Sequence, residues 1–193
     1  MRDKAGLKLI VGVTGASGSR YALRLLEALR DKGIGRVLII SRNGEAIARH
    51  ELGEEGLRRM RELSSEAYTN DLQCPYISGS SKFDGMVVVP CSMKTLSEIS
   101  IGYSSSAISR IADVALKEGR PLVLVPRETP LSAIHLENML RASRAGAIIL
   151  PAMPAFYMGP RDIEDLVNFV VGRILDVLGI DNDLYRRWGG WAT

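Results

Sequence analysis

The chain has few of the residues on which metal sites and disulfide frameworks depend. Its 193 residues include two cysteines, Cys74 and Cys91, and two histidines, His50 and His135. The cysteines form no Cys-x-x-Cys pair, which argues against a disulfide scaffold and a zinc site, so no metal is predicted. Cys91 follows an apolar run, where a small buried thiol is favoured over a nucleophile. We expect His50 on a solvated helix face and a structural role for His135.

Long apolar runs and a strong net charge are also missing. No run approaches the roughly 20 residues that cross a membrane as a helix. Residues 1–8 lack the apolar core of a signal peptide, so cytoplasmic residence is expected. The net charge is +3, and aromatic residues make up 6% of the chain. The densest basic group, Arg58, Arg59 and Arg61, is typical of a solvated helix face, and no nucleic-acid partner is expected.

What the chain does contain is a regular alternation of apolar runs with helical patterns. Hydrophobic residues make up 46%, enough for the core of one domain covering residues 1–193. Runs such as Met86-Val87-Val88-Val89 are typical of parallel strands buried on both faces. The pattern predicts strands at 7–14, 36–41, 85–90, 122–126 and 147–150, and helices at 19–32, 44–63 (broken near Gly53), 105–118, 132–142 and 161–178. We therefore expect a single-domain α/β fold with a doubly wound parallel sheet, Rossmann- or flavodoxin-like.

The clearest local signal is the turn between the first strand and the first helix, Thr14-Gly15-Ala16-Ser17-Gly18. The glycines permit a tight turn and a close approach of the backbone to a ligand, and Ser17 is placed to cap the helix. Backbone N–H groups at a helix start favour an anion, so a phosphate-bearing ligand is predicted here. The spacing matches neither G-x-G-x-x-G nor a Walker A loop, and a tight turn without a ligand is the alternative.

Ligands of doubly wound sheets bind beyond the carboxyl ends of the strands. The second predicted strand ends at Ser41-Arg42-Asn43, which lacks the acidic residue that usually holds the NAD ribose. The Tyr-x-x-x-Lys pair of short-chain dehydrogenases occurs nowhere in the chain. Ser41 suits a mononucleotide, or equally a hydrogen bond to the backbone at the strand end.

The next two strand ends carry hydroxyl, cationic and acidic side chains. Ser92-Met93-Lys94-Thr95 suits a phosphate or the edge of a flavin ring, and the alternative is a loop before the next helix with Ser105 as its N-cap. The guanidinium fork of Arg127 suits phosphate. Glu128, beside an anion in a dry pocket, would have a raised proton affinity and could carry protons, whereas the alternative is a surface ion pair.

The last loop and the last helix add apolar and cationic groups. Tyr157 lies in loop 151–160 among prolines and the apolar side chains of Met153, Phe156 and Met158, which predicts an apolar pocket with one hydroxyl. Arg173 lies in an otherwise apolar helix segment, so its charge needs a partner unless the head group reaches solvent.

Taken in order, these segments resemble the flavin prenyltransferases, the UbiX-like enzymes, within the Rossmann-like flavin-binding decarboxylase superfamily. The resemblance rests on Gly12-Val-Thr-Gly-Ala-Ser-Gly18, Pro90-Cys-Ser-Met-Lys-Thr-Leu96, Val125-Pro-Arg-Glu-Thr-Pro-Leu131, Pro151-Ala-Met-Pro-Ala-Phe-Tyr157 and residues 165–179. It implies that reduced FMN is a substrate, alkylated at N5 by dimethylallyl phosphate and closed onto C6, and that the prenylated flavin serves a UbiD-like decarboxylase. It also implies a homo-oligomer, typically a dodecamer, with the site at a subunit junction.

The resemblance also implies roles for individual residues. Flavin contacts are implied for Gly15, Ala16, Ser17, Ser41, Ser92, Met93, Lys94, Thr95 and Arg127. Glu128 is implied to transfer protons and Ser17 to lie near the reacting N5 atom, which makes both catalytic. A prenyl-phosphate clamp is implied for Lys117, Tyr157, Arg173 and Arg110. Trp188 is implied as a wall of the prenyl pocket, to which the tail of about residues 181–193 contributes.

Two departures from related enzymes bear on the competing functions. Metal-dependent prenyl transfer uses Asp-rich clusters, and Asp181-Asn-Asp183 is too sparse for one, so a metal-independent prenyltransferase is favoured. The cysteine decarboxylases of the superfamily use a catalytic His and a Pro-x-Met-Asn-x-x-Met-Trp loop, and residues 151–157 lack its Asn and Trp. The alternatives are such a decarboxylase, a flavin-binding subunit that supports a decarboxylase without chemistry of its own, and an NADP-dependent reductase.

Overall fold

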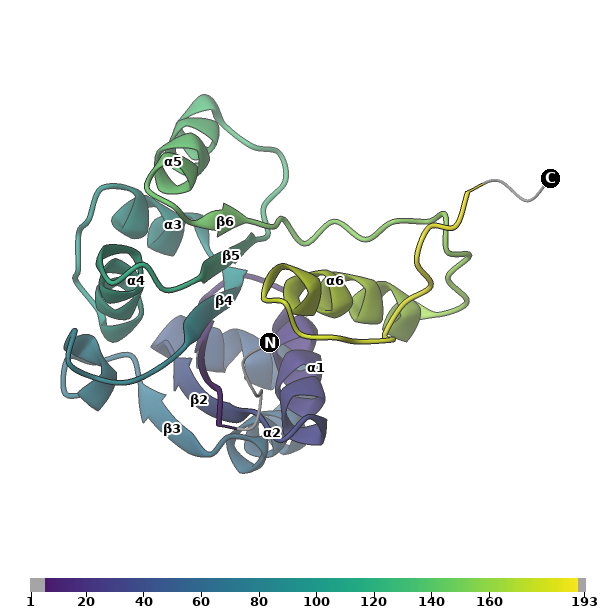
Figure 1. Cartoon of the computed structure of the whole chain (residues 1–193), viewed down its shortest axis with the longest axis horizontal. Helices are drawn as coiled ribbons and strands as arrows, with labels where there is room; N and C mark the ends of the chain where they lie inside the picture. Colours follow the sequence, from purple (N-terminus) through teal and green to yellow (C-terminus); the bar gives the residue numbers. More distant parts are fainter. Residues whose placement is uncertain (1–5, 191–193) are drawn as a thin grey trace.

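Residues 6–190, which the computed structural model describes, form a six-stranded sheet whose neighbouring strands all run parallel (Figure 1). The strands are β1 (Lys8–Val13), β2 (Gly35–Ile40), β3 (Glu66–Thr69), β4 (Gly85–Cys91), β5 (Leu122–Pro126) and β6 (Ile148–Ile149). Their order across the sheet, β3-β2-β1-β4-β5-β6, is that of a Rossmann fold. The strand order reverses between β1 and β4, and a ligand crevice is therefore expected at the carboxyl ends of these two strands.

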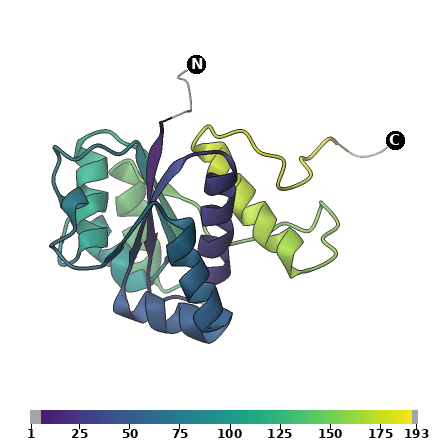
Figure 2. The ribbon, with the colours of Figure 1, turned by 90° about the horizontal axis from the view of Figure 1, so that it is seen from below.

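Helices cover both faces of the sheet (Figures 1 and 2). They are α1 (Ser19–Asp31), α2 (Arg42–Leu63), α3 (Met93–Ser100), α4 (Ala107–Lys117), α5 (Ala133–Arg144) and α6 (Ile163–Val177), with a short 3₁₀ turn at Pro75–Ile77. The sheet has a hydrophobic core on each face. Successive side chains of a strand point to opposite faces, so alternate residues belong to different cores. Val11 and Val87 pack with α1, α2 and α6, whereas Ile10 and Val88 pack with α3, α4 and α5.

The predicted fold class is confirmed, and so is the break in the second helix, where Gly53 has a φ of +72°. Three elements were missed: β3, the 3₁₀ turn Pro75–Ile77 and α3. The four residues of β3, Glu-Ala-Tyr-Thr, form an edge strand that is too polar and too short for a clear apolar pattern. Helix α3 was not predicted, and the alternative of a loop at Ser92–Thr95 is wrong, because α3 begins at Met93 and buries Leu96 and Ile99 at one-turn spacing.

The structure places the two cysteines and the two histidines as the sequence analysis predicts. Cys74 and Cys91 are buried free thiols, and His50 is exposed on α2. His135 has a structural role, because its Nδ1 accepts a hydrogen bond from the Ser132 N–H at the start of α5 (3.3 Å). Within residues 6–190, no His, Cys, Asp and Glu side chains gather into a possible metal site, and no helix is both long and apolar enough to span a membrane.

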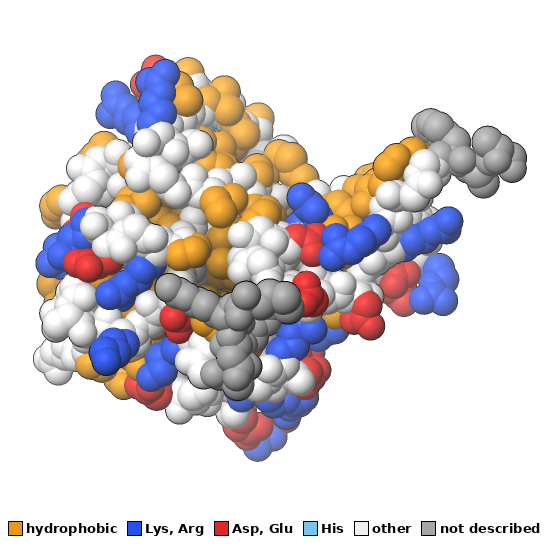
Figure 3. Space-filling model, viewed as in Figure 1, with side chains coloured by type: hydrophobic (Ala, Val, Ile, Leu, Met, Phe, Trp, Pro, Cys, Tyr) orange, Lys and Arg blue, Asp and Glu red, His pale blue; other side chains and the backbone are white. Residues whose placement is uncertain are grey.

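Exposed hydrophobic side chains concentrate in two areas of the surface (Figure 3). One is α5, where Ile134 and Leu140 are 69% and 50% exposed. The other is the arm made by loop 151–162 and the C-terminal segment 181–190, where Phe156 is 74% and Trp188 is 52% exposed. Groups of large apolar side chains in water are typical of surfaces that pack against another molecule.

Candidate functional site

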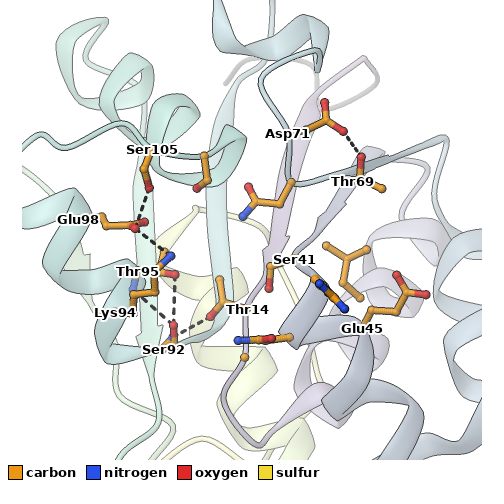
Figure 4. A pocket seen from close by; sticks show the side chains of 16 residues that line it. Thr14, Ser41, Glu45, Thr69, Asp71, Ser92, Lys94, Thr95, Glu98 and Ser105 are labelled. Atoms are coloured by element: carbon orange, nitrogen blue, oxygen red, sulfur yellow. Dashed lines mark hydrogen bonds and ion pairs between the residues drawn. The ribbon is translucent and has the colours of Figure 1, made fainter.

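A cavity of about 660 Å³ opens at the carboxyl ends of β1, β2, β3 and β4 (Figure 4). Its lining comes from the end of each strand and from the loop before α4: Thr14, Gly15, Ile40, Ser41, Arg42, Asn43, Glu45, Thr69, Asn70, Asp71, Ser92, Lys94, Thr95, Glu98, Ser105 and Ser106. Most of these side chains carry hydroxyl, amide or charged groups. The size falls within the range of small-molecule and cofactor pockets. We call this cavity the β1–β4 cavity.

Helices α2, α3 and α4 begin at the β1–β4 cavity, each with a serine as its N-cap. The Ser41 hydroxyl accepts a hydrogen bond from the Gly44 N–H (3.0 Å), and the Ser92 hydroxyl accepts one from the Thr95 N–H (3.4 Å). The Ser106 hydroxyl accepts one from the Ser109 N–H (3.3 Å), so Ser106 rather than the expected Ser105 caps α4. Because helix N-termini carry partial positive charge, their convergence makes this cavity suited to an anionic group such as a phosphate.

Close backbone packing fixes the two strand ends nearest the topological switch. The Thr14 hydroxyl donates to the Pro90 carbonyl (2.8 Å) and accepts from the Ser92 N–H (2.7 Å), so the ends of β1 and β4 are held together. A side chain at Gly15 would collide with Asn43, because an added Cβ would lie 2.6 Å from the Asn43 Cβ. The need for glycine in the first turn is therefore steric.

The charges inside the β1–β4 cavity are partly neutralised by ion pairs. The Lys94 ammonium lies 3.0 Å from the Glu98 carboxylate, which also accepts a hydrogen bond from the Ser105 hydroxyl (2.8 Å; Figure 4). Glu98 is 8% exposed, so the carboxylate is held below the cavity surface. Lys94 is largely exposed and remains free to turn toward an anion.

A second cavity, of about 480 Å³, lies on the α1 side of the first turn and contains Ser17, Glu51 and Arg127. The Arg127 guanidinium donates to the Ser17 carbonyl (3.2 Å), which joins the ends of β1 and β5. Glu51 accepts hydrogen bonds from the N–H groups of Gly18 (3.0 Å) and Ser19 (2.7 Å). The anion that occupies the N-terminus of α1 is therefore a carboxylate of the protein.

One prediction for the first turn is wrong as a result. Ser17 does not cap α1, because the N-cap is Gly18 and Glu51 supplies the capping oxygens from another helix. The first turn does not offer a free N-terminus to a phosphate. Burial raises the pKa of Glu51, but hydrogen bonds from Ser17, Ser19 and Gly18 outweigh it and hold the pKa below its ordinary value. Glu51 is therefore ionised at neutral pH.

The residues of the expected prenyl-phosphate clamp divide between the two faces of the sheet. Tyr157 and Trp188 lie together, with ring centroids 5.5 Å apart, and Arg173 is on α6. Lys117 ends α4 and pairs with Glu118 (3.2 Å), on the opposite face of the sheet from α6. Arg110, also on α4, donates to Asp113 (2.8 Å). The sheet thus separates Lys117 and Arg110 from Arg173 within one chain.

Arg173 also borders an apolar groove of about 330 Å³ between β6 and α6. The other lining residues are hydrophobic or proline: Ile148, Ile149, Leu150, Pro151, Met153, Phe169, Val170 and Val177. The expected partner of the Arg173 charge is present, because its guanidinium lies 3.1 Å from the Asp176 carboxylate and donates to the Tyr185 hydroxyl (3.3 Å).

Comparison with known proteins shows the family to which this chain belongs. The model of a family described as Flavoprotein matches residues 1–175. A flavin prenyltransferase UbiX of Methanocaldococcus jannaschii is 53% identical over 184 residues, which cover 95% of this chain and 99% of that protein. This chain belongs to the flavin prenyltransferase family.

Solved structures of family members share the fold throughout. An AnUbiX (PadA1) structure in complex with FMN and dimethylallyl pyrophosphate has a TM-score of 0.92 and 45% identity, covering 96% of this chain and 99% of that one. A dodecameric FMN-dependent UbiX-like decarboxylase from Escherichia coli O157:H7 has a TM-score of 0.91 and 46% identity, covering 95% and 100%. The likeness thus includes the strand ends that build both cavities.

In this flavin prenyltransferase family member, Glu128 lies apart from the two cavities. It is exposed, and its carboxylate accepts a hydrogen bond from the Thr129 N–H (3.0 Å). The dry pocket expected around Glu128 is not formed by residues 6–190 of a single chain. Glu51 was missed by sequence reasoning, because nothing in its local pattern marks it and its contacts lie 32 and 33 residues away in the chain.

Proposed function

We propose that this protein is a flavin prenyltransferase that joins the dimethylallyl group of dimethylallyl phosphate to N5 and C6 of reduced FMN. The observation that carries the proposal is the convergence of α2, α3 and α4, with their serine caps, on the β1–β4 cavity. A homologous structure holds FMN and dimethylallyl pyrophosphate on the same fold, which supports this pair of substrates.

FMN fits the chemistry of the β1–β4 cavity. The helix N-termini and the hydroxyls of Ser41 and Ser92 suit the phosphate, and Lys94 adds a cation that can turn toward it. Gly15, Ala16 and Ser17 lie between the two cavities, where the flavin ring would reach from the phosphate site to Arg127. We therefore assign Gly15, Ala16, Ser17, Ser41, Arg127 and the run Ser92-Met93-Lys94-Thr95 to FMN binding.

Prenyl transfer breaks the allylic C–O bond and releases inorganic phosphate, so the site must hold the leaving phosphate. Lys117, Arg110 and Arg173 supply cations and Tyr157 a hydroxyl donor, whose charge-assisted hydrogen bonds strengthen as the negative charge develops. Trp188 packs edge-on against Tyr157 and offers a π face to the allylic cation. N5 loses one proton as it bonds to the allylic carbon. Ring closure then breaks the prenyl double bond: one alkene carbon takes up a proton, the other bonds to C6, and C6 loses its own proton.

Carboxylates are available to take those protons. Glu51 is ionised and bonded to the turn that contains Ser17, so it can accept a proton through the serine hydroxyl. Glu128 follows Arg127. Once a neighbouring chain covers it, its protonated form can give a proton to the alkene carbon, and the resulting carboxylate can accept the C6 proton. We assign Ser17 and Glu128 as catalytic residues, with Glu51 acting beside Ser17.

The separated cations call for a second copy of the chain. Since Lys117 and Arg173 lie on opposite faces of one sheet, a site with both takes them from different copies. The exposed hydrophobic side chains on α5 and on the arm offer surfaces for that assembly, and a homologous structure is dodecameric. We propose a homo-oligomer, a dodecamer, whose tail of about residues 181–193 helps to form the prenyl pocket; residues 191–193 lie outside the described residues. The product would be passed to a UbiD-like decarboxylase, and residence in the cytoplasm stays a prediction.

The test is to incubate the purified protein anaerobically with reduced FMN and dimethylallyl phosphate, then to extract the flavin for mass spectrometry. We expect a flavin heavier by one dimethylallyl group and equimolar inorganic phosphate. A parallel incubation with the diphosphate identifies the preferred donor. Bound but unmodified FMN with both donors would instead indicate a flavin-binding subunit without prenyltransferase chemistry. A third incubation, with a cysteine-terminated peptide, detects decarboxylation directly.

A further inference from the structure

The C-terminal segment 181–190 donates several hydrogen bonds to one carboxylate of α6, that of Asp176. Its Oδ1 accepts hydrogen bonds from Arg187 (2.7 Å) and Asn182 (2.9 Å). Its Oδ2 accepts from the Tyr185 hydroxyl (2.5 Å) and from Arg173 (3.1 Å). The side chain of Asp176 is 14% exposed, so this carboxylate is largely enclosed by its partners. Groups from the tail and the Arg173 guanidinium thus share one anion.

Aromatic packing continues from the same cluster toward the expected prenyl pocket. The Tyr185 ring lies edge-on to Phe169 (5.0 Å between centroids), Phe169 to Tyr157 (6.0 Å), and Tyr157 to Trp188 (5.5 Å). Gly172 makes room for the Tyr185 ring, because an added Cβ would lie 2.5 Å from that ring. The tail therefore follows a defined path across α6, and Trp188 is placed against Tyr157.

The electrostatics favour a charged carboxylate and accessible cations. Burial raises the pKa of Asp176, but hydrogen bonds from Arg187, Tyr185 and Asn182 outweigh it and keep the pKa below its ordinary value. The side chains of Arg173 and Arg187 are 46% and 58% exposed, so their remaining N–H groups can reach a ligand. Removing the carboxylate would leave two like charges side by side, and their repulsion would move both guanidiniums.

We propose that Asp176 is a positioning residue for prenyl transfer, which holds Arg173 toward the prenyl phosphate and, through Arg187 and Tyr185, docks the tail so that Trp188 lies against Tyr157. The inference rests on the proposed function, because it takes Arg173 as a phosphate ligand. Asp176 itself does not touch the substrate.

The test compares Asp176→Asn and Arg187→Ala in the full-length oligomer. We expect the KM for dimethylallyl phosphate to rise about tenfold in each, as for the loss of one hydrogen bond to a charged group, while the Kd for FMN stays within about twofold. The double variant should be little worse than Asp176→Asn alone, because that change already removes the anion to which Arg187 binds. Arg187 is exposed at the surface, so its variant keeps the test valid if Asp176→Asn fails to fold.

The matched control is Glu164→Gln, on the same helix, where the carboxylate pairs with Arg20 of α1 instead of the tail. It should leave the KM unchanged. A separate readout is tryptophan emission, since the two tryptophans of the chain, Trp188 and Trp191, both follow Arg187. Release of the tail should shift the emission to the red in Asp176→Asn and not in Glu164→Gln.

The possible failures are distinguishable. A wild-type protein that makes no prenylated flavin refutes the proposed function. A wild-type protein that makes it, with unchanged KM and emission in Asp176→Asn and Arg187→Ala, overturns the positioning role alone. An equal rise of KM in Glu164→Gln would also overturn it, because the effect would then belong to any lost charge on α6.

Discussion

The β1–β4 cavity and the surface formed by α6 and the C-terminal segment present their polar groups in different ways. In the cavity, hydroxyls and helix N-termini from one chain already face a common space of about 660 Å³. On α6, Arg173 is half exposed and borders an apolar groove, while Lys117 lies on the far face of the sheet. In a parallel sheet, the carboxyl ends of all strands lie at the same edge. Helices on opposite faces of the sheet are separated by the sheet itself. In the function that we propose, one chain can therefore build the flavin site, whereas the prenyl-phosphate site needs a neighbour.

The largest expected effect concerns Glu128, which is exposed in one chain and catalytic in the assembled site we propose. Glu128→Gln should retain FMN with an unchanged Kd and lower the rate of prenylated-flavin formation about 10²- to 10⁴-fold, the range for loss of a general acid or base. Mass spectrometry of the extracted flavin over time measures the rate. Glu62→Gln, an exposed change on α2, is the control. A wild-type rate in Glu128→Gln would remove this residue from the mechanism.

The next effect tests the division of the clamp between chains. Lys117→Ala and Arg173→Ala should each lower kcat/KM for dimethylallyl phosphate about 10- to 100-fold, because each removes a charge-assisted hydrogen bond to phosphate. When the two variants are co-expressed in equal amounts, about one quarter of the sites would combine wild-type Lys117 from one chain with wild-type Arg173 from another.

Activity in the mixed oligomer should therefore recover to about a quarter of the wild-type value. Each variant expressed alone and purified by the same procedure is the control. Absence of recovery would mean that one chain supplies both residues, and the contrast between the two regions would then be wrong.

A smaller effect separates the two roles of a serine cap at the β1–β4 cavity. Ser92→Ala should lower the free energy of unfolding by about 1 kcal/mol and weaken FMN binding, because the hydroxyl both caps α3 and lines the cavity. Urea unfolding and flavin fluorescence titration measure the two changes. Ser132→Ala removes the cap of α5 away from the cavity and should lower the stability by a similar amount without changing the Kd for FMN. Equal FMN affinities in both variants would argue against Ser92 as an FMN ligand.

The smallest expected effect concerns the two cysteines, whose thiols should not react in the native protein. Burial raises the pKa of Cys91 to about 12, and burial likewise raises the pKa of Cys74. Because the reactive form is the thiolate, native protein at pH 8 should resist iodoacetamide, and both thiols should react once urea unfolds the chain. Mass spectrometry after labelling measures this. Rapid labelling of native Cys91 with loss of activity would indicate that Cys91 is a nucleophile and not a thiol packed in the core.

Much of this architecture could be predicted because it is encoded locally. Continuous apolar runs such as residues 85–90 located the buried strands, and the breaks in pattern located the strand ends where Ser41, Ser92 and Arg127 lie. The elements that were missed had weaker local signals. β3 is a polar edge strand of four residues, and α3 begins directly at the end of β4 without an intervening turn.

The sequence by itself determined the doubly wound fold, the strand ends and the family, because burial repeats every 2 or 3.6 residues and the motifs are contiguous. The tertiary structure alone decided that Glu51 occupies the N-terminus of α1, that Asp176 joins Arg173 to the tail, and that the sheet separates Lys117 from Arg173. These arrangements depend on how α2, α6 and the tail pack. Packing brings together residues that are far apart in the chain, and such contacts leave no periodic pattern in the sequence.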